Sequence, residues 1–183
     1  LVFPQRQLIT TAKQIATLDQ MSGGRVLLGV GVGWMPEEFE ALGVPFERRG
    51  KRTDEYIEAM RELWTSDLPT YHGEFVAFER VHCRPRPANG AVPIIIGGHS
   101  KAAARRAGRL GDGFFPAREF VHELGYLVRE TAEEAGRDPN NIEIVTNMPE
   151  DEAEMVPLAQ AGVTRMMVPV VGLAGIKDRG ING

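Results

Sequence analysis

The stretch "IIIGGHSKAA", residues 94–103, combines residue types that can hold a phosphate group. Two glycines follow an apolar run, and Ser100 stands where a helix would begin. Such a turn leaves the backbone N–H groups from Gly98 to Lys101 at the positive end of a helix dipole, an arrangement that binds anions. A tight strand-to-helix turn with a serine cap and no ligand uses the same residues. The stretch alone leaves these two interpretations equal.

A second candidate is "GVGVGW", residues 29–34, where glycine occupies every other position. On one strand, Gly29, Gly31 and Gly33 would share a face, because successive side chains point to opposite sides. The resulting gaps suit either a bulky planar ligand or crowded packing inside a barrel. A dinucleotide-binding fingerprint is not indicated, because Trp34 and the residues after it stand where that motif needs a helix. Trp34 could stack on a ring, although such a tryptophan is more typical of a core.

The remaining polar residues define no catalytic centre of their own. Arg52 could neutralise a phosphate with its forked guanidinium, or it could form a surface ion pair on a charged helix. The four histidines share no spacing that suits a metal, so no metal site is predicted. No serine elbow, catalytic cysteine context or close carboxylate pair is present. The sequence therefore indicates that a bound cofactor supplies the chemistry.

Strands and helices that alternate along the chain must position these residues. Apolar runs predict strands at 25–32, 93–97, 112–115, 142–145 and 164–168, with a strand stub at 1–4. Helical periodicity is predicted at 9–21, 48–65, 100–110, 120–135 and 151–161. The helix at 9–21 would bury Ala12, Ile15, Leu18 and Met21, and the helix at 48–65 would bury Ile57, Met60, Leu63 and Trp64. The acidic "EFEAL" is expected to form a solvated loop.

This alternation predicts an α/β fold with a parallel sheet, either an open doubly wound sheet or a (β/α)8 barrel. The 183 residues favour one domain, with residues 66–92 as an insertion that forms a hairpin or extended segment. A full barrel commonly needs about 250 residues, so this chain would supply only its later part. In both architectures ligands bind at the carboxyl ends of the strands.

The composition argues against two classes of partner, nucleic acids and membranes. The net charge is −4 with both signs interspersed, which excludes a basic surface for nucleic acid. No apolar run approaches the length of a membrane span, so a membrane partner is not expected. Cys83 is the one cysteine and is expected to be an ordinary residue, which favours a cytoplasmic location.

Three long blocks closely resemble the luciferase-like monooxygenase family, in particular its deazaflavin-dependent branch, which uses coenzyme F-420. They are "TAKQIATLDQMSGGRVLLGVGVGW", "EEFEALGVPFERRGKRTDEYIEAMRELW" and "PIIIGGHSKAAARRAGRLGDGFFP", in that order. The resemblance covers residues 2–170 and implies a TIM barrel of the bacterial luciferase-like type. This chain would hold the barrel from the end of strand three to strand eight. Domain 1–183 would then be an N-terminally truncated barrel, with the usual catalytic residues upstream of Leu1.

The resemblance also implies cofactor-binding positions. Strand four would end at Val32, Gly33 and Trp34, strand five would end in the turn of Gly97, Gly98, His99, Ser100 and Lys101, and strand six would contain Asp112, Gly113 and Phe114. Arg52 and Lys101 fall where some family members contact the cofactor phosphate.

The resulting hypothesis is an oxidoreductase that transfers a hydride, or activates dioxygen, through bound coenzyme F-420, with FMN as the alternative cofactor. Its partner would be a small organic substrate, and the resemblance implies a homodimer to which helix 11–21 contributes. A sugar-phosphate lyase or isomerase is an alternative enzyme class, but the visible strand ends offer no lysine or carboxylate pair. A non-catalytic truncated barrel that is stabilised by pairing with another chain is the non-enzymatic alternative.

Overall fold

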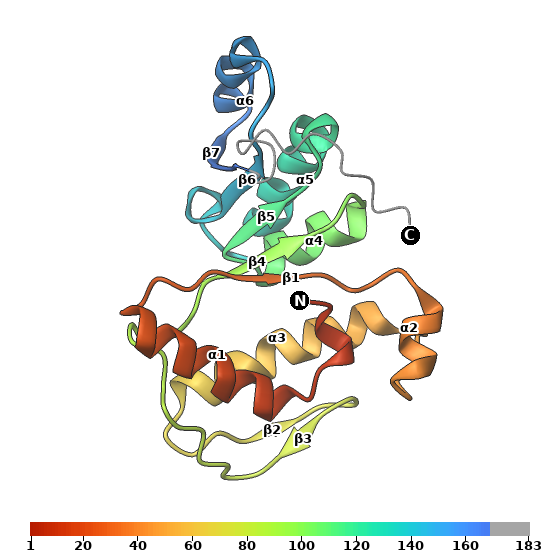
Figure 1. The fold of residues 1–183 in the computed structure, drawn as a ribbon, viewed down its shortest axis with the longest axis vertical. Helices are drawn as coiled ribbons and strands as arrows, with labels where there is room; N and C mark the ends of the chain where they lie inside the picture. The colour runs from red at the N-terminus through yellow and green to blue at the C-terminus, as the bar shows by residue number, and fades with distance from the viewer. Residues whose placement is uncertain (169–183) are drawn as a thin grey trace, which may run out of the picture.

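The computed structural model describes residues 1–168, which form one parallel sheet with helices and a small hairpin (Figure 1). In the described part of the chain the sheet has five strands in the order β1-β4-β5-β6-β7. These are β1 (Leu28–Val30), β4 (Ile94–Gly97), β5 (Gly113–Phe115), β6 (Glu143–Asn147) and β7 (Val163–Met167). The helices are α1 (Leu8–Ser22), α2 (Pro36–Ala41), α3 (Arg49–Thr65), α4 (Lys101–Leu110), α5 (Val121–Glu134) and α6 (Met155–Gln160). The predicted strand-and-helix alternation is confirmed.

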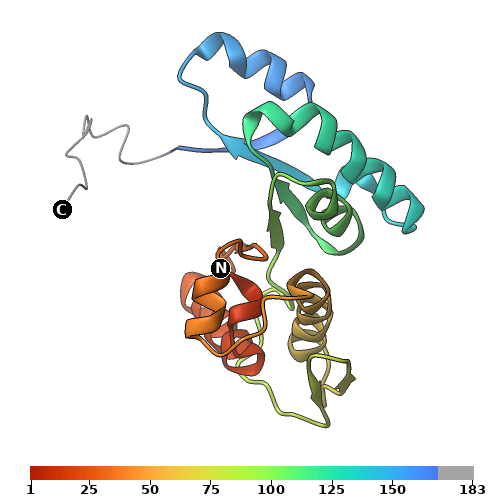
Figure 2. The same cartoon turned by 90° about the vertical axis from the view of Figure 1, so that its right-hand side faces the viewer.

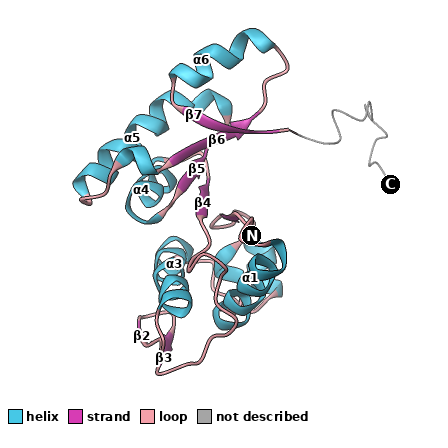
Figure 3. Cartoon of the chain, turned by 90° about the vertical axis from the view of Figure 1, so that its left-hand side faces the viewer, coloured by secondary structure: helices cyan, strands magenta, loops and turns pink. Residues whose placement is uncertain are grey.

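Period-two alternation separates the two faces of this sheet. One row of register partners consists of Val30, Ile96, Phe114 and Ile144, and all four side chains are buried. They pack in the core under the helices, and α4, α5 and α6 lie on the same side of the strands (Figure 3). The next row, Gly31, Gly97, Phe115 and Val145, faces the other way. One face therefore builds the core, and the other is left for a site.

The expected strand stub at 1–4 pairs in parallel beside β1 over a short length, whereas the loop expected at "EFEAL" is wrong. The stub at 1–4 makes a single parallel bridge, Val2 to Gly31, and the chain then turns into a 3-10 helix at Phe3–Gln5. The "EFEAL" segment is helical, because Pro36 starts α2 and Phe39 is fully buried. Proline at the first helical position and two glutamates in the first turn are recognised helix-start signals. Both signals are present in the sequence, and burial of Phe39 makes this short charged segment a helix.

The buried face of α1 also differs from the expectation. Its buried residues are Leu8, Thr11, Ala12, Ala16 and Asp19, whereas Leu18 and Met21 are exposed. A spacing of three residues falls short of a full helical turn by about 60°, so three such steps carry a side chain from one face to the other. The expected face of α3 is confirmed: Ile57, Met60, Leu63 and Trp64 are all fully buried.

The first part of the chain forms its own half of the molecule around α1 and α3, below the strands from β4 onward (Figure 2). The Trp64 indole N–H donates to the Ala12 carbonyl over 3.0 Å, which ties α3 to α1. The segment 66–92 contains the predicted hairpin, with β2 (Tyr71–His72) antiparallel to β3 (Ala77–Phe78). Residues 169–183, which include the end of the expected domain, lie outside the described residues.

A single carboxylate holds the hairpin turn against α3. Oε1 of Glu55 accepts the backbone N–H groups of Phe75 at 2.7 Å and Val76 at 2.6 Å, and Oε2 accepts that of Glu74 at 2.9 Å. Hydrogen bonds to a charged group contribute more than neutral ones, about 1.5–3 kcal/mol each. Glu55 therefore determines where this turn lies on α3.

We expect Glu55→Gln to lower the free energy of unfolding by about 1.5–3 kcal/mol, because an amide N–H₂ then replaces one acceptor facing the turn. Urea unfolding measures this loss. Glu62→Gln is the matched control, because Glu62 accepts a single N–H, that of Thr70, over 3.3 Å. Equal losses in both variants would contradict the assigned role of Glu55.

Candidate functional site

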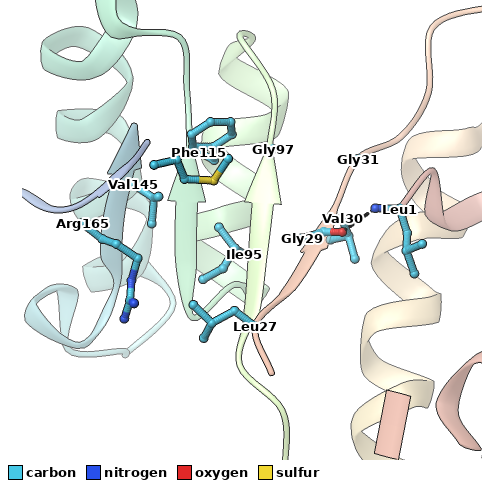
Figure 4. A pocket seen from close by; sticks show the side chains of 11 residues that line it. Leu1, Leu27, Gly29, Val30, Gly31, Ile95, Gly97, Phe115, Val145 and Arg165 are labelled. Atoms are coloured by element: carbon cyan, nitrogen blue, oxygen red, sulfur yellow. Dashed lines mark hydrogen bonds between the residues drawn. The ribbon is translucent and has the colours of Figure 1, made fainter. Parts of the chain in front are cut away.

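The inner face of the sheet carries an apolar pocket of about 380 Å³. It is lined by Leu1, Leu27, Gly29, Val30, Gly31, Ile95, Gly97, Phe115, Val145, Arg165 and Met167. Figure 4 shows Gly97 and Phe115 toward the carboxyl ends of the strands and Leu27 toward their amino ends. Gly29 and Gly31 leave open space here, since a Cβ atom on either would meet no atom within 4 Å. These two glycines thus provide the gap that the sequence pattern predicts.

Arg165 supplies the charge in this otherwise apolar lining. Its guanidinium forms a two-pronged ion pair with Glu143, at 2.9 Å and 3.1 Å, and points toward the amino ends of the strands (Figure 4). The hydrogen bond from Arg165 lowers the pKa of the Glu143 carboxyl, so that the pair stays ionised at neutral pH. The charge is thereby neutralised at the amino end of the pocket, and the carboxyl end stays apolar.

The turn after β4, Gly97 to Lys101, is the candidate anion cradle. Ser100 caps α4, because its Oγ accepts the N–H of Ala103 at 3.2 Å. Gly98 has a φ of +148°, a conformation that L side chains rarely adopt, and a Cβ there would lie 2.8 Å from the Cβ of Ala103. The first N–H groups of α4 therefore point out of the helix beside a backbone without side-chain cover.

Side chains of the turn contact the next strand-to-helix connection. Nδ1 of His99 accepts the backbone N–H of Ala117 at 2.9 Å, and its ring stacks on Phe120 with a centroid distance of 6.1 Å. The Lys101 ammonium lies 3.6 Å from Glu123 at the start of α5. Gly97, Gly98, His99, Ser100 and Lys101 thus form one continuous feature at the carboxyl end of the sheet.

The expected end of strand four is placed differently. β1 ends at Val30, so Val32, Gly33 and Trp34 lie beyond it, and none of the three lines the pocket. Gly33 leaves the strand with a φ of +77°, and a Cβ there would come within 2.8 Å of Val2 and Phe39. It provides close packing in place of a third gap. Trp34 is 77% exposed, so the expectation of a core residue is wrong.

Arg52 lies on α3 and is only 7% exposed. Its Nη1 donates to the Pro45 carbonyl at 2.7 Å, and its guanidinium lies 5.0 Å from the centre of the Phe75 ring. The surface ion-pair interpretation is therefore wrong. The guanidinium supports the loop before α3 and the hairpin turn, and the pocket lining does not include it.

None of the three residues expected in strand six lines the pocket. Asp112 lies before β5 at the amino end of the sheet, where its carboxylate accepts the Ile94 N–H and an Arg61 N–H at 2.9 Å and 2.8 Å. Gly113 lies beneath Ile95, whose Cδ1 would be 2.6 Å from a Cβ there. Phe114 is fully buried in the core. As cofactor contacts, Asp112 and Phe114 are corrected, because they lie at the amino end of the sheet and in the core. Gly113 lies on the pocket face, but the Ile95 side chain stands between it and the pocket.

The pocket residues that sequence reasoning missed are Leu1, Leu27, Val30, Ile95, Phe115, Val145, Arg165 and Met167. The alternation of side chains along each strand could have identified residues of the pocket face from the sequence. Once Phe114 is assigned to the core, the two-residue period of a strand directs Phe115 into the opposite face. Applying the same alternation to each strand identifies the whole inner row.

Taken together, these features define part of a parallel (β/α) barrel with an apolar inner pocket and a serine-capped glycine turn at the carboxyl ends of the strands. Comparison with known proteins agrees, since the sequence pattern described as luciferase-like monooxygenase matches residues 1–156. The chain belongs to this family, whose members are oxidoreductases and monooxygenases.

Curated relatives include an uncharacterised protein of Mycobacterium tuberculosis, 41% identical over 150 residues, which cover 80% of this chain and 51% of that protein. An FMNH2-dependent dimethylsulfone monooxygenase of Pseudomonas putida is 34% identical over 140 residues, 74% of this chain and 39% of that protein. The chain thus spans about half the length, or less, of these relatives.

Solved structures with the same fold include a monooxygenase from Streptomyces bottropensis, with a TM-score of 0.68 and 30% identity. The match covers 87% of this chain and 51% of that one. A coenzyme F-420-dependent secondary alcohol dehydrogenase, solved with an F-420–acetone adduct, gives a TM-score of 0.70 at 29% identity over 78% of this chain and 45% of that one. The five-stranded sheet is therefore part of a luciferase-like TIM barrel.

Proposed function

We propose that this chain forms the phosphate-binding part and one wall of the ring pocket of a deazaflavin-dependent oxidoreductase acting on a small organic substrate. Coenzyme F-420 is the first candidate cofactor. The observation that carries the proposal is the position of Gly97. This residue lines the apolar pocket and also begins the cradle, so a planar apolar ring and an anionic tail meet at one point of the chain.

The residues present fit such a cofactor. Gly29 and Gly31 leave the space that a flat ring needs, and Ile95, Phe115 and Val145 supply apolar contacts around it. At the end of the cradle, the N–H groups of Ser100 and Lys101 open α4 toward a phosphate, and the Lys101 ammonium, which is paired with Glu123 at an exposed site, lies beside them. The apolar pocket thus matches the ring of such a cofactor, and the polar cradle matches the phosphate on its side chain.

Reduced deazaflavin supplies a hydride to an oxidised carbon of a substrate, chemistry that no side chain provides. The residues of this chain have three tasks. The cradle binds and orients the phosphate, the apolar row of the inner face excludes water from the ring, and Arg165 with Glu143 closes the amino end of the pocket with a neutralised pair.

FMN is the second candidate, and the 34% identical relative from Pseudomonas putida, whose name states FMNH2 dependence, favours it. Both cofactors carry a phosphate on the side chain of a tricyclic ring system, so the cradle serves either. Their chemistry differs, because reduced FMN can activate dioxygen for monooxygenation. The two candidates are therefore distinguished by ring binding and not by the phosphate.

We expect micromolar binding of coenzyme F-420 or FMN, and binding at least about tenfold weaker for the same ring without its phosphate. The loss of even one charge-assisted hydrogen bond, about 1.5–3 kcal/mol, corresponds to this factor. Fluorescence titration of the chain with F-420, FMN, riboflavin and dephosphorylated F-420 measures it. Equal binding of phosphorylated and dephosphorylated rings would refute the cradle, and no binding of either ring would refute the proposed function for this chain.

A further inference from the structure

We propose that His99 is a positioning residue that couples the cradle to the connection after β5, residues 116–123, through the hydrogen bond accepted by its Nδ1. The consequence for cofactor binding rests on the proposed function. The coupling itself is a property of the protein without cofactor. Through this coupling, the orientation of the peptide N–H groups in the cradle depends on residues 116–123.

The hydrogen bond fixes the chemical form of the imidazole. The partner of Nδ1 is the backbone N–H of Ala117, which can only donate, at 2.9 Å. Nδ1 must therefore be the unprotonated nitrogen, and in the neutral ring Nε2 carries the hydrogen. Neither a phenyl ring nor an aliphatic side chain can accept this N–H.

His99 stands at the point where coupling would act on the cradle. It lies between Gly98, whose unusual backbone shapes the turn, and Ser100, whose Oγ caps α4. A side chain fixed at this position restrains the peptide groups on both sides of it. The N–H groups that face an anion belong to these same peptides and to the first turn of α4.

Further contacts join the same two segments and support the assignment. The ring of His99 stacks on Phe120 at an interplanar angle of 27°, and Lys101 pairs with Glu123 at 3.6 Å. The N–H of Gly98 also donates to the Phe115 carbonyl at 3.2 Å. The ion pair is exposed and contributes little, and the Gly98 bond belongs to the backbone. Among these side-chain contacts, His99 therefore supplies the directional one.

Two substitutions distinguish the contribution of the hydrogen-bond acceptor of His99 from that of its ring. His99→Asn places a carbonyl oxygen near the position of Nδ1 and keeps the acceptor, whereas His99→Phe keeps a ring against Phe120 and removes the acceptor. Amide hydrogen exchange of the full chain without cofactor is measured by NMR at Ala117 and at Gly98, because these two N–H groups are hydrogen-bonded, to His99 Nδ1 and to the Phe115 carbonyl. In the wild type, the ¹⁵N shifts of the His99 ring are expected to be those of the tautomer protonated at Nε2.

We expect His99→Phe to speed exchange at Ala117 about fivefold, the ratio that corresponds to one ordinary hydrogen bond, and to speed exchange at Gly98, the hydrogen-bonded amide of the cradle, as well. His99→Asn should restore both rates to within about twofold of the wild type. Faster exchange at Ala117 alone would overturn the coupling. Failure of His99→Asn to restore the rates would overturn the role of the acceptor.

Cofactor titration of the same variants tests the functional consequence. We expect His99→Phe to weaken binding of phosphorylated F-420 or FMN several-fold and His99→Asn to restore it. Unchanged binding in His99→Phe would overturn a positioning role in cofactor binding. If the wild type binds neither cofactor, the proposed function fails, and the exchange rates still decide whether the two segments are coupled.

Discussion

Replacing Asp54 by alanine is expected to destabilise the protein by about 3–5 kcal/mol. The Asp54 carboxylate on α3 accepts hydrogen bonds from two arginines of α4. The donors are the Nε–H of Arg106 and, at 3.0 Å, an N–H of Arg109. The Arg106 side chain is only 8% exposed, and its other contact is the Gly50 carbonyl. Without the carboxylate, a guanidinium charge would remain buried and uncompensated, and removal of one partner from a buried pair costs about this much.

Urea unfolding gives the comparison, with Asp67→Ala as the matched control. Asp67 also pairs with two arginines, Arg84 and Arg86, but its side chain is 89% exposed. We expect the control to lose less than about 1 kcal/mol, because water screens exposed pairs. The same number of ion pairs is removed in each variant, so the difference measures burial. Similar losses in the two variants would show that Arg106 is not a buried charge that depends on Asp54.

Arg52, Asp54 and Arg106 show which part of this fold the sequence could not reveal. Each lies on a helix among other charged residues, a pattern typical of a solvated face, yet the first and last are buried. Their partners are a loop carbonyl, a ring of the hairpin and a second helix, all distant along the chain. Periodicity describes a helix in isolation and carries no information about which neighbour covers its charged side.

The strands could be predicted better from the sequence, because the alternation of side chains along a strand alone defines its two faces. The apolar runs predicted the five parallel strands, and Ser100 with the preceding glycines predicted the serine-capped turn into α4. The expectations that fail concern the face of the sheet on which a residue lies and the end of the strand to which it belongs. Asp112 and Phe114 were assigned by their place in a resembling block, whereas the register puts one at the amino end and the other in the core. A shift of one residue turns a side chain to the opposite face, so Phe115 lines the pocket.

The second large effect is expected at Gly98. Gly98→Ala should weaken binding of the phosphorylated cofactor roughly 100-fold, which corresponds to the loss of one or two charge-assisted hydrogen bonds. Its φ of +148° disfavours any side chain, and the new Cβ would lie 2.8 Å from the Cβ of Ala103. Ala103 belongs to the first turn of α4, so relief of this contact moves the N–H groups that face the anion.

Gly90→Ala separates this effect from simple backbone strain. Gly90 also has a positive φ, +86°, but a Cβ there would meet no atom within 4 Å. Both variants should lose about 1–3 kcal/mol of stability from the strained backbone. Only Gly98→Ala should lose phosphate-dependent binding, with little change toward the dephosphorylated ring. If both variants bind the phosphorylated cofactor as the wild type does, the anion is held elsewhere. If both lose it equally, global destabilisation explains the loss, because only Gly98 shares the cradle with α4.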